Sequence, residues 1–411
     1  MLTVFSRTLI VALLTALVWS GAAGAPGLAP GLDPAPATAA KAKSGKTQKG
    51  KAKRSGAKKS KQAKKDFKSL PSSRKAIWGP TDAFSTYKKL RVGIWQYQLL
   101  WNQVATRRPD DPRDPDDPAY SWPAALDQAV KDARKAKIDV ALMVRATPGW
   151  ANGGQAFSIP PTSDRDYADF VVAAAKRYPR VRRWMIWGEP NQHFHWAPTP
   201  ARAYAQPLSK ADREAPRRYA RLVDRAYGAL KARSKRNLVI AGMTFTTGHI
   251  APRDWIRNMR LPNGKPPRMD LYGHNPFSAR RPNLKNPRLE HGLADMSSVR
   301  HLAGWVDRWI DRRRSRKARR ADPMELYLSE FTLPTDHANR FFNFYVSRGT
   351  QASWLRSALA IARKRSSRIA AFGWFTLQDQ PSAADGYETH WGLVDEHGKP
   401  KPAYAVFRRG R

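Results

Sequence analysis

Eight short apolar segments recur along the chain, each followed by a loop and then, in most cases, by a helical stretch. The segments are KAIWG (75–79), LRVGIWQ (90–96), IDVALMVRA (138–146), RRWMIWG (182–188), NLVIAGMTF (237–245), MDLYGHN (269–275), ELYLSEF (325–331) and IAAFGWFTL (369–377). Stretches with apolar residues at helical spacing lie between them, the clearest at 123–136, 166–178, 217–234 and 351–365. Apolar strands that alternate with helices are typical of a parallel sheet covered on both faces. Eight such units predict an α/β fold of the closed (β/α)8 type, a TIM barrel, rather than an open sheet.

Several classes of site are absent from the sequence. No phosphate-binding loop of the G-x-G-x-x-G or G-x-x-x-x-G-K type follows the first predicted strand, which argues against a nucleotide-binding protein. The chain has no cysteine, so thiolate metal sites and cysteine nucleophiles are excluded. His193 and His195 have no third ligand in a recognisable pattern. We therefore expect neither a metal nor a cofactor.

The first 25 residues have the pattern of a secretory signal peptide. Arg7 precedes an apolar run at 9–19, and small residues at 23–25 follow it. The run is short for a membrane span, and no other apolar run is long enough to cross a bilayer. We expect a secreted, extracellular protein with no integral span after cleavage; an uncleaved anchor is the alternative.

Residues 26–72 predict a linker rich first in proline and alanine and then in lysine. Lys41–Lys68 contains 13 lysines and arginines against one acid, a composition typical of a disordered segment. This basic arm is either a tether to an anionic cell-wall or matrix polymer or a solubilising spacer. Residues 69–411 carry +29 of the total charge of +41, which would also attract anionic chains. No recognisable nucleic-acid module is present, so a specific nucleic-acid partner is not expected.

Two glutamates occupy the ends of predicted strands within the domain at 73–411. In a (β/α)8 barrel the chemistry lies at the carboxyl ends of the strands. The fourth strand leads to Glu189 and the seventh to Glu330, on facing sides of the mouth. His274 ends the sixth strand and Trp374 lies in the eighth. The strand ends therefore predict a pair of carboxylates at one mouth of the barrel.

The segments around these glutamates resemble clan A glycoside hydrolases, with family 39 and family 5 the most similar. The resemblance rests on WMIWGEPN at the fourth strand and LYLSEFT at the seventh, with support from ALMVRATPGWAN, YGHNPFS and the ending GWFTLQD…GLVDEHGKPKPAYAVF. It covers roughly residues 77–407. It implies that Glu189 is the general acid/base, that Glu330 is the nucleophile, and that the substrate is a polysaccharide or oligosaccharide.

Two carboxyl groups suit the cleavage of an acetal with retention of configuration. One group donates a proton to the leaving oxygen and the other attacks the anomeric carbon from about 5 Å away, without a cofactor. We expect burial among Trp187 and Trp196 to disfavour ionised Glu189, and hydrogen-bond donors to keep Glu330 charged. Aromatic rings near strand ends are candidates for contact with sugars: Trp101, Trp150, Trp187, Phe194, Trp196, Trp374 and Trp391. Packing in the core is the alternative for Trp187 and Trp374.

One position departs from the clan pattern. The clan usually has Asn directly before the acid/base, where it binds the sugar 2-hydroxyl, and this chain has Gly188. Either Asn191 or another donor replaces that amide, or the 2-position of the substrate is unusual, or catalysis has been lost. His274 is expected to contact sugar or organise hydrogen bonds, and Arg145 either reaches the mouth or pairs with an acid. The rival to an enzyme is a non-catalytic barrel that binds glycans.

Overall fold

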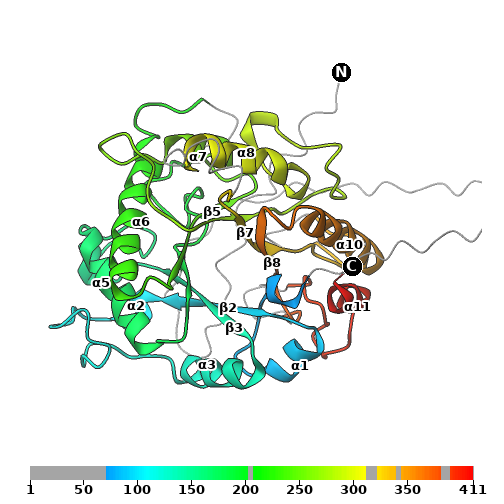
Figure 1. Ribbon diagram of the computed structural model, residues 1–411, viewed down its shortest axis with the longest axis horizontal. Coiled ribbons are helices and arrows are strands. Elements are labelled where there is room, and N and C mark those ends of the chain that lie inside the picture. Colours follow the sequence, from blue (N-terminus) through cyan, green and yellow to red (C-terminus); the bar gives the residue numbers. More distant parts are fainter. Residues whose placement is uncertain (1–70, 202–206, 312–321, 339–343, 381–388, 411) are drawn as a thin grey trace, which may run out of the picture. The chain divides into compact units, whose positions relative to one another are not determined.

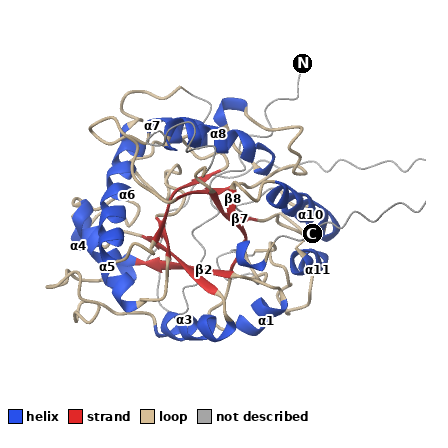
Figure 2. Cartoon of the chain, in the orientation of Figure 1, coloured by secondary structure: helices blue, strands red, loops and turns tan. Residues whose placement is uncertain are grey.

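The computed structural model describes residues 71–201, 207–311, 322–338, 344–380 and 389–410, and these contain a closed barrel of eight strands (Figures 1 and 2). The strands are β1 (Lys75–Trp78), β2 (Ile94–Leu100), β3 (Asp139–Arg145), β4 (Arg183–Ile186), β5 (Leu238–Phe245), β6 (Leu271–Asn275), β7 (Leu326–Phe331) and β8 (Ile369–Trp374). Each strand pairs in parallel with its neighbours in sequence, and β1 pairs with β8 to close the ring. The predicted TIM barrel is confirmed. The predicted signal peptide and Lys41–Lys68 lie outside the described residues.

Helices surround the barrel on its outer side (Figure 2). Among the described residues they are α1 (Phe84–Lys89), α2 (Trp101–Val104), α3 (Ala124–Ala136), α4 (Gly149–Asn152), α5 (Asp164–Arg177), α6 (Glu214–Arg233), α7 (Pro252–Asn258), α8 (Val299–Trp309), α10 (Arg348–Lys364) and α11 (Pro402–Arg409). Serine side chains cap the first turns of two of these helices. The Ser163 hydroxyl accepts from the Arg165 amide at the start of α5, and the Ser347 hydroxyl accepts from the Thr350 amide at the start of α10. Within the described ranges, none of these helices combines the length and apolar character needed to cross a membrane.

The second strand begins four residues later than the sequence pattern predicted. Leu90 caps α1 and Val92 donates its amide to the Tyr87 carbonyl, so both belong to the turn that precedes β2. Both side chains are buried in the hydrophobic core. These residues are therefore apolar because they pack beneath α1, and an apolar run alone did not separate that turn from the strand.

Two irregularities in the ladder lie next to the candidate site. The pairing of β5 with β6 shifts register between Ala241 and Thr244, and that of β7 with β8 shifts between Leu328 and Phe331. Such bulges re-aim side chains and free backbone groups from the ladder. Both bulges lie toward the carboxyl ends of their strands, where the glutamates emerge.

The interior of the barrel is crowded where β8 passes β7. A Cβ atom built on Gly373 would lie 2.0 Å from the Ser329 carbonyl oxygen and 2.8 Å from the Gln96 side-chain nitrogen. Gln96 is on β2, so the missing side chain of Gly373 would point into the barrel. Only glycine allows this approach without moving the backbone.

We expect Gly373→Ala to lower the free energy of unfolding by about 3 kcal/mol or more, because a methyl group cannot share this space with a backbone oxygen. Gly304→Ala is the matched control, since Gly304 is exposed on α8 and an added Cβ would meet no atom within 4 Å. The control should gain about 0.5–1 kcal/mol from helix propensity. Denaturant unfolding of both variants measures this, and equal stabilities would contradict the argument.

Candidate active site

Glu189 is held by backbone bonds that extend β4 beyond its last regular residue. The Trp187 amide donates to Val144 on β3 and the Glu189 amide donates to Met243 on β5, each at 3.0 Å. The Met243 carbonyl is available because it lies within the β5 bulge. Trp187 and Glu189 have φ angles of 64° and 45°, in the left-handed region that side chains rarely adopt. Backbone strain of this kind is concentrated at functional sites.

Glu330 is positioned by the bulge in β7. The carbonyl of the preceding residue, Ser329, accepts hydrogen bonds from the Trp78 indole at 3.0 Å and from the Gln96 amide at 2.9 Å. These donors come from β1 and β2, so the bonds cross the interior of the barrel. They fix the backbone at Ser329 and Glu330 independently of the strand ladder.

Asn275, at the end of β6, connects the two glutamates. Its side-chain nitrogen donates to Glu189 Oε1 at 2.7 Å, and its oxygen accepts from the Ser329 hydroxyl at 2.6 Å. The Asn275 side chain also lowers the pKa of Glu330, against the larger effect of burial. All three side chains are fully buried. The prediction that strands four and seven bring two carboxylates to one place is consistent with this geometry.

Glu189 has further hydrogen-bonding groups close to its carboxylate. The Gln192 amide donates to Glu189 Oε2, and His195 Nδ1 lies 3.5 Å from the same oxygen. Burial lowers the pKa of His195, which favours the neutral ring, while its interaction with Glu189 opposes this shift. Asn275, Gln192 and His195 thus surround Glu189 with polar groups.

Glu330 lies in a poorer environment for a charge. Within the described residues neither carboxyl oxygen makes a hydrogen bond of ordinary length and angle. Burial raises the pKa of Glu330 well above its ordinary value, the charge of Glu189 raises it further, and Arg145 and Asn275 oppose both effects. This is the reverse of the expected distribution, in which donors surrounded Glu330 and Glu189 was desolvated. Trp187 packs in the core and donates to the His195 carbonyl, and amide and imidazole groups lie against Glu189 instead.

Arg145, at the end of β3, is the cation that acts on both glutamates. Only 4% of the residue is exposed, and its guanidinium donates to the Gln98 side chain at 3.4 Å. Burial lowers the pKa of Arg145 to about 10 and the two glutamates oppose that shift, so the group stays charged at neutral pH. Arg145 lies at the carboxyl end of β3, where its charge acts on both glutamates, so its position fits both alternatives that the sequence left open.

The space beside Gly188 is filled. A Cβ atom there would lie 2.7 Å from Met143 Sδ and 3.8 Å from Arg145 Cδ. Asn191, predicted to replace the missing amide, is committed elsewhere: its nitrogen donates to the carbonyls of Phe245 and Ile250, and its oxygen accepts from the Phe245 amide. Asn191 therefore holds the loops after β4 and β5 together and offers no free amide to a sugar.

Most of the tryptophans predicted to contact substrate are packed in the core. Trp101 is fully buried and stacks on Phe170 with ring centroids 5.6 Å apart. Trp150 is partly buried, donates to the Ala105 carbonyl and has the Arg108 guanidinium 4.6 Å above its ring. The predictions that Trp101 and Trp150 contact substrate are corrected, because other groups of the protein already pack against these rings.

Residues of the fourth, sixth and eighth strands follow the alternatives that the sequence left open, which are core packing for Trp187 and Trp374 and the organisation of hydrogen bonds for His274. Trp187 is fully buried, donates to the His195 carbonyl and packs edge-on against Trp196. Trp374 is fully buried beside Phe331. His274 is fully buried, with one ring nitrogen bonded to Thr244 and the other to the Ala294 carbonyl, and burial lowers its pKa to about 4. The ring nitrogens of Trp187 and His274 are thus already bonded to groups of the protein, so neither residue offers a free polar atom to a sugar.

The interior positions at these strand ends belong to residues that the sequence analysis did not assign. Asn275 takes that position in β6. After β8, Phe375 packs between Trp78 and Trp391, with centroid distances of 6.4 and 5.7 Å. Gly273 and Gly373 were the available signals, because a glycine inside a strand marks close approach within the barrel, and strand alternation then places residues 275 and 375 on the same inner side.

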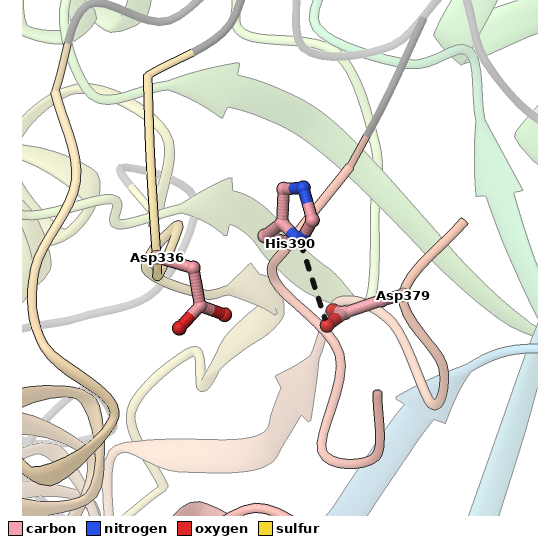
Figure 3. Close-up of side chains that lie close together, drawn as sticks. All are labelled: Asp336, Asp379 and His390. Atoms are coloured by element: carbon pink, nitrogen blue, oxygen red, sulfur yellow. Dashed lines mark ion pairs between the residues drawn. The ribbon is translucent and has the colours of Figure 1, made fainter. Parts of the chain in front are cut away.

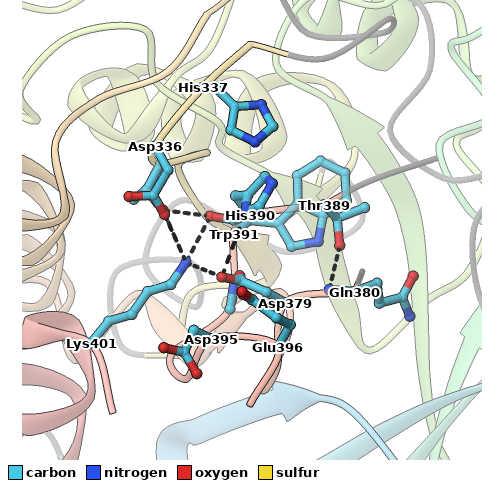
Figure 4. A network of polar contacts seen from close by, with 12 residues as sticks. Asp336, His337, Asp379, Gln380, Thr389, His390, Trp391, Asp395, Glu396 and Lys401 are labelled. Atoms are coloured by element: carbon cyan, nitrogen blue, oxygen red, sulfur yellow. Dashed lines mark hydrogen bonds and ion pairs between the residues drawn. The ribbon is translucent and has the colours of Figure 1, made fainter. Parts of the chain in front are cut away.

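A second polar cluster flanks the β7 and β8 side of the mouth. Asp336, Asp379 and His390 place ligand atoms within 4.8 Å of one another (Figure 3), a donor set that suits a divalent cation. However, the Lys401 ammonium lies 2.5 Å from Asp379 Oδ2 and 3.9 Å from Asp336 Oδ2, and it donates to Thr335 and to the His390 carbonyl (Figure 4). The lysine side chain is fully buried. The lysine thus supplies the positive charge that this donor set would take from a metal ion.

This network holds the loop that carries Trp391. Besides Lys401, Thr335 donates to the His390 carbonyl, Thr332 donates to the Trp391 carbonyl, and the Gly392 amide donates to Asp379 Oδ1 at 2.7 Å. The start of α11 therefore ties together the loops that follow β7 and β8.

Solved structures that are similar to this barrel in fold include glycoside hydrolases. A family 39 glycoside hydrolase from Bacteroides cellulosilyticus WH2 matches with a TM-score of 0.55 and 17% identity, over 84% of this chain and 65% of that one. The fold is that of the clan A glycoside hydrolases. A glucosidase from Croceicoccus marinus (TM-score 0.54, 13% identity, 82% and 67% covered) and a monomeric β-xylosidase from Caulobacter crescentus CB15 (0.52, 17%, 81% and 66%) share it.

The glycoside hydrolase fold is thus shared at low sequence identity, and the chain spans about two thirds of the length of these proteins. No protein-family model and no curated protein matches the sequence.

We expect Glu330→Gln to stabilise the folded protein at neutral pH. Because the folded-state pKa of Glu330 is raised, the unfolded chain loses its proton first as pH rises. The contribution of Glu330 to stability is therefore complete at acid pH and declines as pH rises toward the folded-state pKa. The difference in Tm between variant and wild type should be small near about pH 4 and reach a few degrees near about pH 8. Exposed Glu290→Gln is the control, and a pH-independent difference would contradict the assignment.

We expect Lys401→Met to cost about 3–5 kcal/mol, because it leaves the Asp379 carboxylate buried without its cation. The double variant Lys401→Met/Asp379→Asn should recover most of this loss, whereas exposed Lys399→Met should have little effect. Thermal unfolding measures all three. A wild-type protein whose Tm falls on chelation with EDTA would show instead that the cluster binds a metal.

Proposed function

We propose that this protein is a retaining glycoside hydrolase that cleaves O-glycosidic bonds of a polysaccharide or oligosaccharide through a two-glutamate double displacement. The observation that carries the proposal is the buried pair Glu189 and Glu330, linked through Asn275 and acted on by Arg145. A carbohydrate substrate is supported by the glycoside hydrolase neighbours. The Asn275 amide donates to Glu189 and lowers the pKa of Glu330. This supports a short separation between the two carboxyl groups, as retaining enzymes need.

In the first step Glu189 donates its proton to the glycosidic oxygen while Glu330 attacks the anomeric carbon. The C–O bond to the leaving group breaks and a glycosyl ester forms on Glu330. Glu189, now ionised, then takes a proton from water, which attacks the anomeric carbon and releases Glu330 as a carboxylate. Atoms and charge balance without a cofactor.

The protonation state of the pair has to change when substrate arrives. Without substrate, burial favours a proton on Glu330. A sugar would bring hydroxyl donors to a carboxylate that has few, and Arg145 already favours its charged form. Substrate binding is therefore proposed to move the shared proton from Glu330 to Glu189, which is the state that the reaction requires.

A barrel that had lost its reaction would gain little from keeping this arrangement. A buried carboxyl with a raised pKa costs stability at neutral pH, and replacement by a neutral side chain would remove the cost. The presence of both glutamates beside a buried arginine favours a catalyst over the glycan-binding alternative that Gly188 suggested.

We further propose that the protein is secreted and that Lys41–Lys68 attaches it to an anionic cell-wall or matrix polymer. The support is the apolar run at 9–19 after Arg7 and the 13 basic residues against one acid in the arm. Retention on an anionic polymer that disappears with added salt and with removal of the arm would support the tether; retention that ignores both would refute it.

The test of the reaction is release of reducing ends from a panel of neutral and acidic polysaccharides. Glu189→Gln should lower kcat by about 10²–10⁴-fold and Glu330→Gln should abolish turnover, while Glu290→Gln keeps wild-type activity. A 2-fluoro glycoside of the cleaved sugar should label Glu330, detected by peptide mass. Labelling of Glu189 would reverse the two roles. Binding without any release of reducing ends would favour the non-catalytic barrel.

A further inference from the structure

Three large apolar side chains are exposed among the described residues, and all three lie on one end of the barrel. They are Phe157, Phe194 and Tyr345, with exposed fractions of 48%, 46% and 50%. Phe157 lies between β3 and α5, Phe194 between β4 and α6, and Tyr345 between β7 and α10. Loops that lead from a strand to the next helix lie at the carboxyl ends of the strands, where both glutamates are. Exposed rings scattered over a surface need no explanation, but these share the catalytic end.

Phe194 lies five residues beyond Glu189, on a loop held by its own hydrogen bonds. The Trp196 amide donates to the Gln192 carbonyl, and the Thr199 hydroxyl donates to the Pro190 carbonyl. The ring makes edge contacts with His249 and His193 at centroid distances of 5.4 and 5.9 Å. Burial lowers the pKa of His249 to about 4, so its ring is neutral at neutral pH. The Phe194 ring is thus held by contacts with two histidine rings, although nearly half of the residue is exposed to solvent.

Phe157 extends this side of the mouth. The Phe157 carbonyl accepts from the Thr147 amide directly after β3, and the neighbouring Ser158 carbonyl accepts from the Ala197 amide. The second bond ties the loop of Phe157 to the loop of Phe194. The two exposed rings therefore belong to one connected surface on the acid/base side.

Tyr345 lies on the other side of the mouth. In the closed order β1 to β8, β7 is opposite β3, so the loops with Tyr345 and Phe157 start from opposite strands. The segment at Tyr345 is anchored by a bond from the Val346 amide to the Pro334 carbonyl and by a bridge between Thr335 and Val346. The catalytic pair thus has exposed rings on the loops after both its nucleophile strand and its acid/base strand.

We propose that Phe194 and Tyr345 stack on sugar units on either side of the scissile bond, so that the substrate is a glycan chain bound at several units rather than a terminal sugar with a small leaving group. A flat apolar ring matches the C–H face of a pyranose, which buries apolar area without loss of the sugar's hydrogen bonds. Rings on both sides hold a chain across the glutamates. This inference rests on the proposed function, since it names the substrate class of the same site.

The test compares aryl glycosides with linear xylo- and gluco-oligosaccharides from disaccharide to hexasaccharide. In wild type, kcat/KM should rise with chain length. In Phe194→Ala and in Tyr345→Ala the ratio of kcat/KM for hexasaccharide to that for aryl glycoside should fall about tenfold, mainly through KM. Phe194→Trp should restore the ratio, because it restores a flat ring, which a purely structural role for the loop would not require. Wild-type activity with a ratio that does not change in either alanine variant would overturn the inference and leave the proposed function standing.

Binding provides a second readout that does not need turnover. In a Glu330→Gln background, retention of the protein on a polysaccharide gel should weaken when Phe194 or Tyr345 becomes alanine. If wild type hydrolyses no substrate and the gel still retains it through these rings, the proposed reaction is refuted and the stacking of sugars on Phe194 and Tyr345 is supported. If neither ring affects retention, the stacking is refuted.

Discussion

The Ser329 carbonyl is the point on which the candidate site depends. The bulge in β7 removes this oxygen from the regular ladder, and a buried carbonyl without a donor is costly. The Trp78 indole on β1 and the Gln96 amide on β2 satisfy it across the interior of the barrel, and Gly373 leaves the space that this approach requires. The adjacent Glu330 is thereby aimed into the mouth. The position of Glu330, the proposed nucleophile, is thus set by hydrogen bonds across the barrel rather than by its own contacts.

Electrostatics in the site follow from this placement. Glu330 makes no hydrogen bond of ordinary length and angle within the described residues, and burial and the charge of Glu189 raise its pKa. Glu189, by contrast, is surrounded by amides and an imidazole. Arg145 keeps its charge despite burial and opposes the rise in the pKa of Glu330. The two glutamates in turn oppose the fall in the pKa of Arg145.

The sequence predicted the barrel and its two glutamates because both depend on local patterns. Apolar runs alternate with amphipathic helices, and each glutamate comes directly after such a run. It did not predict which of two neighbours faces inward at a strand end, because β6 and β8 are buried on both faces and their apolar runs do not alternate. His274 and Trp374 were chosen, whereas Asn275 and Phe375 take the inner positions. Composition also does not show which aromatic rings are exposed, and four tryptophans near strand ends proved to lie in the core. Whether a ring is buried depends on partners that are distant in sequence, such as Phe170 for Trp101.

The replacement of asparagine by Gly188 can be understood from packing. A side chain at this position would collide with Met143, and the aliphatic part of Arg145 lies next to it, so residues of β3 fill the space that an asparagine would need. Asn191 does not substitute, because its amide is fully used on the β5 loop. Polar groups near the pair come instead from Asn275, Gln98 and Arg145. Donors near Glu189 and Glu330 thus come from neighbouring strands, and the absence of an asparagine at position 188 is not by itself evidence against the proposed reaction.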